Sequence, residues 1–182
     1  MSEPCFIILS AKNPAFWPSF GADSSGEFLL AVLSKHSEED TDLPADAGAF
    51  LYSGAGRTPF LKDDGGNLLW RASAGGDGPS ILPLGPFMCG FASGEEVLRP
   101  DHVRRLTEGG AELLITVAEY ALSEEVLNAA ARTRAAENRI FSLLAIPGRP
   151  PAVFDPEGEE ISPLRGPRGE EYFLRKAGLQ LR

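Results

Sequence analysis

Short apolar runs alternate with polar, glycine-rich and proline-rich segments in the first half of the chain. Residues 5–11 (CFIILSA) predict a buried strand. Residues 26–39 (GEFLLAVLSKHSEE) place apolar side chains at helical spacing after a possible cap at Ser25, so they predict a helix. In residues 58–73, two apolar runs flank the sequence DDGGN, and this arrangement predicts a β-hairpin whose glycines supply positive φ.

The second half of the chain alternates more regularly between strand-like and helical segments. Its apolar runs are short and continuous, whereas its longer segments are rich in Ala, Glu and Arg. This order predicts a mixed α/β fold. Strands are expected at residues 81–89, 111–118 and 140–146, helices at residues 99–110 and 123–139, and a DPEG turn between two strand-like runs at residues 147–162.

Composition limits the class of protein. With 182 residues and 43% hydrophobic residues, the chain can form one domain with a genuine core, and it contains no repeat or compositional boundary. Seventeen basic residues against 26 acidic residues give a formal charge of -9, which disfavours binding to nucleic acid or anionic lipid. The apolar runs are shorter than the roughly 20 residues of a membrane-spanning helix. With no basic n-region at its start, the sequence predicts a single cytoplasmic domain over residues 1–182.

Thiols and imidazoles are too few to suggest a metal or disulfide site. Cys5 and Cys89 lack CxxC spacing, and a zinc site would need nearly all of the cysteines together with His36 and His102. We therefore expect neither a metal nor another cofactor. Cys5 is expected to be a core residue because it begins an apolar run.

Cys89 has two interpretations. It could be a nucleophile at the end of a strand, or a small apolar side chain that fills a core. His102 could act as its base, although a solvated or capping role is the alternative. Glu119 follows the predicted strand at residues 111–118 and is the candidate acid.

Five segments carry a family resemblance when they are taken in order: DDGGNLLWR (63–71), GPFMCG (85–90), GGAELLI (109–115), RTRAAENRIF (132–141) and AVFDPEGEEI (152–161). Together they resemble the nitrilase or carbon-nitrogen hydrolase superfamily. The resemblance extends over residues 60–162, somewhat more than half of the chain, and it indicates a shortened and degenerate relative.

This resemblance implies a fold and a chemistry. The fold would be a mixed-sheet α-β sandwich, a reduced form of the family's α-β-β-α domain. Members hydrolyse or condense non-peptide carbon-nitrogen bonds with a cysteine thiolate, a glutamate general base and a lysine that stabilises the oxyanion. The resemblance places Cys89 at the nucleophile position, and it implies self-association through helices beside that strand.

The sequence departs from the family at two of the three catalytic positions. Ala72 stands where the lysine is expected, and the neighbouring Arg71 would point to the opposite face of a strand. No proline before residue 50 precedes a glutamate, so the general base also lacks a counterpart. A thiol with a pKa near ~8.5 needs a base or a positive field to become a nucleophile at neutral pH.

Three hypotheses follow. The first is a degenerate nitrilase-like pseudoenzyme that acts as a binding or assembly module, with a second copy, another protein or a small amide-like molecule as partner. The second is a divergent amidase-type hydrolase or acyl transferase in which Cys89 works with Glu119 and Arg71. The third is a general α/β domain whose similarity to the family is accidental.

Overall fold

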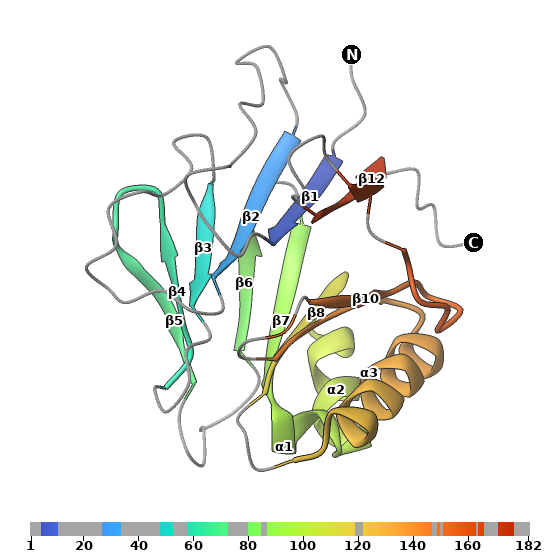
Figure 1. The fold of residues 1–182 in the computed structure, drawn as a ribbon. Helices are drawn as coiled ribbons and strands as arrows, with labels where there is room; N and C mark the ends of the chain where they lie inside the picture. The colour runs from blue at the N-terminus through green and yellow to red at the C-terminus, as the bar shows by residue number, and fades with distance from the viewer. Residues whose placement is uncertain are drawn as a thin grey trace.

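Two β-sheets and a group of helices make up the computed structural model of this chain (Figure 1). It describes residues 5–10, 27–33, 48–52, 58–72, 80–84, 87–118, 122–146, 149, 151–162, 164–165 and 171–176. The strands are β1 (Cys5–Ser10), β2 (Glu27–Leu33), β3 (Ala49–Tyr52), β4 (Phe60–Asp63), β5 (Leu68–Arg71), β6 (Ser80–Leu84), β7 (Phe87–Ser93), β8 (Leu113–Val117), β9 (Phe141–Ala145), β10 (Ala152–Phe154), β11 (Leu164–Arg165) and β12 (Glu171–Lys176). The helices are α1 (Gly94–Val97), α2 (Pro100–Glu108) and α3 (Glu124–Asn138).

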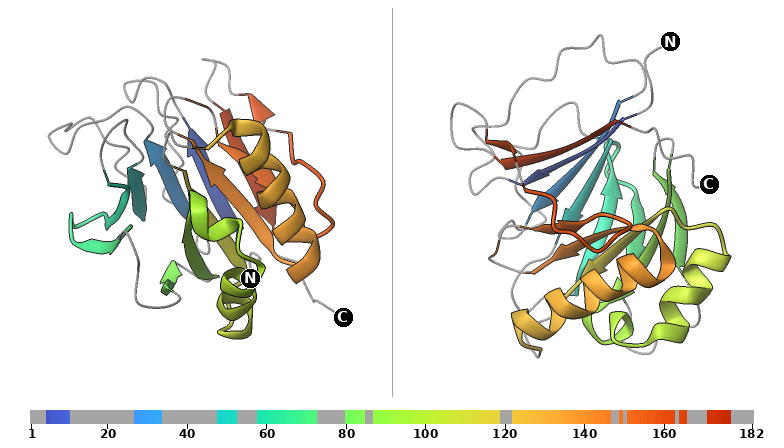
Figure 2. Two further views of the ribbon diagram at one scale, coloured as in Figure 1. Left: turned by 90° about the horizontal axis from the view of Figure 1, so that it is seen from below. Right: turned by 90° about the vertical axis from the view of Figure 1, so that its right-hand side faces the viewer.

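The sheets pack against each other, and the helices cover the outer face of one of them (Figure 2). The seven-stranded sheet has the order β11-β12-β1-β2-β3-β4-β5, and the five-stranded sheet has the order β10-β9-β8-β7-β6. Leu51 and Leu61 of the first sheet share a core with Phe91 and Leu143 of the second. A separate core lies between the five-stranded sheet and the helices.

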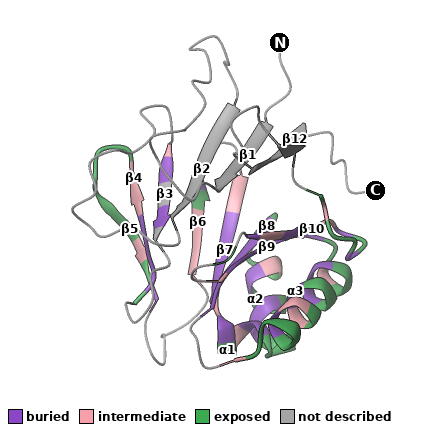
Figure 3. Ribbon diagram, in the orientation of Figure 1, coloured by how far each residue is buried: buried purple, intermediate pink, exposed green. Residues whose placement is uncertain are grey.

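The strands β7, β8 and β9 run parallel; β8 and β9 are fully buried, and β7 is buried at residues 89–92 (Figure 3). Successive side chains of a strand point to opposite faces. In β8, Leu113 and Ile115 therefore face the seven-stranded sheet, whereas Leu114 faces the helices. A strand buried on both faces needs apolar residues at nearly every position, so these segments are continuous apolar runs in the sequence.

Both helices expected in the second half are confirmed. α2 begins with Pro100 in its first turn, where a missing N–H costs nothing, and it ends at Gly109. α3 is capped by Ser123, whose side chain accepts a hydrogen bond from Val126 N at 3.2 Å, and it ends at Arg139 in the left-handed conformation. The strands expected at residues 111–118 and 140–146 and the turn at DPEG are confirmed as well.

The predicted hairpin is confirmed as β4 and β5, which pair antiparallel. Its turn contains Gly66 with a φ of 79°, a conformation that favours glycine. Asp63 closes the turn by accepting hydrogen bonds from Asn67 N at 2.7 Å and from Asn67 Nδ2 at 2.9 Å. These bonds to Asn67 hold the pKa of Asp63 below its usual value.

The helix expected at residues 26–39 is wrong for its first half. Residues 27–33 form β2, which lies between the parallel strands β1 and β3. A short apolar run such as FLLAVL has no periodicity that separates a buried strand from a helix, and here pairing with two neighbouring strands outweighs the helix propensity of Leu and Ala. Residues 34–39 lie outside the described part of the chain.

The segment expected as one strand at residues 81–89 is two strands. β6 ends at Leu84, and β7 begins at Phe87 and pairs antiparallel with it. In the described part of the chain, no helix is both long and apolar enough to span a bilayer.

Candidate functional site

The carboxyl ends of the three parallel strands form the edge at which a ligand site is expected. In open α/β sheets, ligands bind outside these strand ends. Ser93, Val117 and Ala145 are the last residues of β7, β8 and β9, and they lie in register beside one another. The chain passes from Ser93 directly into α1 (Figure 1).

Ser93 and Glu96 close this edge with reciprocal hydrogen bonds. Ser93 N donates to Glu96 Oε2 at 2.7 Å, and Glu96 N donates to Ser93 Oγ at 3.3 Å. This capping box satisfies free N–H groups at the start of α1. Ser93 was not among the residues expected at the site, although the pattern S-x-x-E in SGEE was an available signal.

Gly94 occupies the first position after β7. A Cβ at this residue would lie 3.3 Å from Ala118 Cα and 3.4 Å from a methyl carbon of Leu127. The backbone of the strand-to-helix turn therefore packs directly on the end of β8. A larger side chain at this point requires the surrounding backbone to shift.

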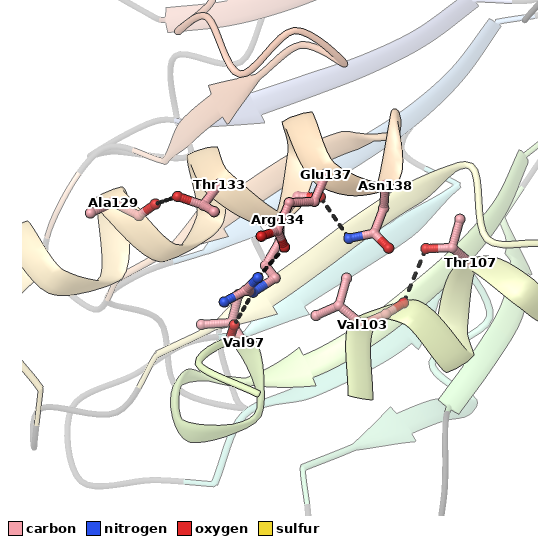
Figure 4. Close-up of polar contacts among 8 residues, drawn as sticks. All are labelled: Val97, Val103, Thr107, Ala129, Thr133, Arg134, Glu137 and Asn138. Carbon is pink, nitrogen blue, oxygen red and sulfur yellow. Dashed lines mark hydrogen bonds and ion pairs between the residues drawn. The ribbon is translucent and has the colours of Figure 1, made fainter. Parts of the chain in front are cut away.

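A hydrogen bond from Arg134 of α3 to the last residue of α1 connects the two helices (Figure 4). Its Nε donates to Val97 O at 3.1 Å, and its guanidinium forms an ion pair with Glu137. Asn138 Nδ2 donates to Arg134 O at 2.9 Å. Glu137 and Asn138 thus fix the end of this helix through their contacts with Arg134, a residue that nothing in the sequence singled out.

Cys89 lies away from this edge. It is the third residue of β7 and pairs with Leu82 and with Leu113, the first residue of β8. The expectation that Cys89 ends a strand is therefore wrong, because β7 continues through Gly90 to Ser93. β7 lies beside β8, the strand formed by the segment AELLITVA.

The Cys89 side chain is fully buried in the core between the two sheets. Burial raises the pKa of its thiol, and the carboxylate of Glu112 raises it further. Glu112 is bonded to Met88, the residue before Cys89. Glu112 N donates to Met88 O at 2.8 Å, and Met88 N donates to Glu112 Oε2 at 3.0 Å. This environment favours the protonated thiol, which is neither a nucleophile nor a metal ligand.

Arg71 lies on the other sheet. Its guanidinium is 5.6 Å from the centre of the Phe60 ring, and its side chain is exposed. The neighbouring Trp70 points into the core between the sheets, so Arg71 points the opposite way. Ala72, at the position where the family resemblance expects a lysine, is 8% exposed and carries no charge.

His102 belongs to α2, on the opposite face of the five-stranded sheet from the Cys89 core. The expected solvated or capping role is wrong because His102 is 4% exposed, and its Nε2 has no hydrogen-bond partner within the described part of the chain. A cysteine-histidine pair with Cys89 is not formed across the sheet. Glu119 lies outside the described residues, and no cluster of three or more metal-binding side chains occurs within them.

Comparison with known proteins finds similarity in the fold. No family model matches the sequence, and no curated protein matches it significantly. Among solved structures, a cysteine-to-alanine mutant of the Nesterenkonia AN1 amidase from the nitrilase superfamily aligns with a TM-score of 0.63 and 17% identity. That alignment covers 97% of this chain and 92% of the amidase. The chain has a nitrilase-like fold.

Further structures of Nesterenkonia amidase agree. A crystal structure of the amidase aligns with a TM-score of 0.58 and 18% identity over 95% of this chain and 89% of that chain. A mutant carrying the acetamide moiety of fluoroacetamide on its active-site cysteine aligns with a TM-score of 0.59 and 18% identity, with the same coverage. The nitrilase-like resemblance and the mixed α/β fold class inferred from the sequence are thus confirmed.

Proposed function

We propose that this nitrilase-like domain does not hydrolyse amides through Cys89 and acts instead as a binding or assembly module. The single observation that carries the proposal is the position of the thiol. Cys89 is fully buried between the sheets near the amino ends of the parallel strands. Ser93 and Gly94, and not Cys89, lie at the carboxyl end of β7.

Catalysis by a thiolate has requirements that the described residues around Cys89 do not meet. The sulfur must reach a substrate, and a base or positive charge must stabilise the thiolate. The charged group that acts on Cys89 is the Glu112 carboxylate, which raises the thiol pKa instead of lowering it. A cation is also needed at the oxyanion, and Arg71 points away from the core that contains Cys89.

A binding role would use the carboxyl edge of the five-stranded sheet. This edge is pre-organised by the Ser93–Glu96 capping box and by the contact of Arg134 with Val97 O. Fixed backbone at the ends of parallel strands is where α/β sheets bind small molecules. A small amide-like molecule is the ligand class that we propose for this edge.

The alternative function is amide hydrolysis by Cys89 with Glu119 as the recruited acid and Arg71 as the cation. It is favoured by the similarity of the fold to amidases, one of which carries a covalent acetamide group on its cysteine. For this alternative, the core between the sheets would have to open so that substrate reaches Cys89.

Thiol modification separates the two functions. The protein would be incubated with fluoroacetamide or iodoacetamide at pH 6.5, and the modified residues would be identified by peptide mass spectrometry. We expect Cys89 in the folded protein to react far more slowly than a free cysteine, because burial keeps its thiol protonated. Protein unfolded in urea provides the control in which Cys89 should react fully.

Ammonia release from butyramide and acrylamide would be measured in parallel, with Cys89→Ala as the matched variant. We expect no release above the level of the variant. Rapid alkylation of Cys89 in the folded protein, together with amide hydrolysis that Cys89→Ala abolishes, would refute the proposal and establish the amidase alternative.

A further inference from the structure

The outer edge of the seven-stranded sheet has an unusual surface. β5 is its last strand and pairs with β4 alone among the described strands, at the outer end of the sheet (Figure 1). Leu68 and Leu69 of β5 are 51% and 37% exposed. They are two of the four large hydrophobic side chains that are exposed in the described part of the chain, and they are adjacent.

A shift of register explains why two consecutive leucines are exposed. Leu61 of β4 pairs with Trp70, but the next residue, Lys62, pairs with Leu68. Leu69 is therefore the extra residue of a β-bulge and has no partner on β4. Trp70 points into the core between the sheets, and the two leucines are left on the surface.

Charges lie at both ends of this leucine pair. Asp64 is exposed in the turn that precedes β5, and Arg71 is exposed at the other end of the strand. Asp63 belongs to the turn itself because both of its carboxylate oxygens accept hydrogen bonds from Asn67. Along the edge, the order is therefore negative charge, two leucines, positive charge.

This order is complementary to itself when a second copy runs in the opposite direction. We propose that two copies of this chain pair through β5, antiparallel, about a two-fold axis that passes between Leu68 and Leu69. Leu68 and Leu69 then meet the leucines of the partner subunit. Arg71 lies beside the turn that carries Asp64 of the partner subunit, and backbone groups at the outer edge of β5 gain ladder hydrogen bonds.

The interface is small because β5 has four residues. Stable complexes bury at least about 1,200 Å² in total, which a pair of such short strands does not reach. The dimer is therefore weak and reversible, and it forms as protein concentration rises. This proposal does not depend on whether Cys89 is catalytic.

Sedimentation equilibrium over a wide range of protein concentrations tests the proposal. We expect reversible dimerisation of the unmodified protein and loss of the dimer in the double variant Leu68→Lys and Leu69→Lys. Val126→Lys is the matched control, because Val126 is 47% exposed but lies on α3. It should leave the dissociation constant unchanged.

Charge reversal tests the antiparallel register independently of the leucines. Asp64→Arg alone and Arg71→Asp alone should each weaken the dimer about two- to fivefold, as expected for exposed ion pairs. The two substitutions together should restore the original dissociation constant. All of these positions are exposed, and circular dichroism would verify that each variant is folded.

Three results would overturn the proposal. These are a protein that stays monomeric at the highest concentration, a dimer that the leucine substitutions leave intact, and a dimer that Val126→Lys disrupts. Recovery of dimerisation by the double charge reversal supports the register, whereas failure of recovery contradicts it.

Discussion

Cys89 illustrates how the place of a side chain within a strand determines its chemistry. Its sulfur lies between two apolar sheets, where a thiol behaves as a small hydrophobe. A strand ending at Cys89 was expected because glycines lie just beyond it, but β7 continues through GFAS (residues 90–93) to Ser93. Glycine at residue 90 allows close packing, because a Cβ there would lie 3.1 Å from Leu106 Cβ.

The pH dependence of stability tests the burial of Cys89. Its pKa is raised in the folded protein, so above about 8.5 the unfolded chain loses this proton while the folded chain keeps it. The contribution is fully present below that pH and declines as pH rises. Between pH 7.5 and 9.5, the unmodified protein should lose about 1.4 kcal/mol more free energy of unfolding than Cys89→Ala.

Urea unfolding at a series of pH values provides this measurement. Cys5 is present in both proteins, so its contribution cancels. Parallel curves for the unmodified protein and Cys89→Ala would contradict the burial of the thiol.

Other residues of the site were predictable to different degrees. The roles of Glu137 and Asn138 could be inferred because both lie at the end of a clear helix. Arg134 could not, since its partner Val97 O is 37 residues away in the sequence. The burial of His102 also depends on how α2 packs, which a charged and polar helix sequence does not reveal.

At the scale of elements, α1 depends on its cap. A helix of four residues has almost no internal hydrogen bonding, so the Ser93–Glu96 capping box and the bond from Arg134 to Val97 O hold it in place. The same cap defines the backbone at the carboxyl edge of β7.

Ser93→Ala should therefore reduce the free energy of unfolding by about 1 kcal/mol, within the usual range for loss of an N-cap. Ser93→Thr keeps the hydroxyl group and should cost less. Ser123→Ala, which removes the cap of α3, gives a matched comparison within the same protein. Denaturant unfolding would measure all three, and equal stability of Ser93→Ala and the unmodified protein would show that the cap contributes nothing.

Prediction of elements succeeded where length or turn chemistry was decisive. α3 has 15 residues rich in good helix formers, and the hairpin of β4 and β5 has a glycine that its turn requires. Residues 27–33 form a strand instead of the expected helix, because a run of six apolar residues (28–33) fits both structures. Its neighbours β1 and β3 decided the outcome.

At the scale of the whole molecule, the two sheets depend on contacts between distant segments. Trp70 of β5 stacks on Phe91 of β7, with ring centroids 4.8 Å apart and an interplanar angle of 27°. Phe91 is 1% exposed and belongs to β7, an interior strand, so this pair links the edge strand of the seven-stranded sheet to the interior of the other sheet.

A double-mutant cycle should detect this link. Phe91→Ala alone should cost about 3–5 kcal/mol of unfolding free energy, as expected for a buried aromatic residue. Combined with Trp70→Ala, the cycle should give a coupling energy of about 0.5–1.5 kcal/mol. Leu127 lies in the core between the five-stranded sheet and the helices. The losses of unfolding free energy from Trp70→Ala and Leu127→Ala should therefore be additive. Additivity in both cycles would mean that the stack does not couple the sheets.

The mixed α/β class, the nitrilase-like order of segments, the hairpin and the two longer helices could be predicted from the sequence alone. They were predictable because apolar runs, caps and turn residues act locally. Tertiary structure decided that residues 27–33 are a strand, that Cys89 lies inside the sandwich and that Leu68 and Leu69 are left on an edge. Each of these depends on which strand lies beside another and in what register, and such pairing joins segments that are far apart in the chain.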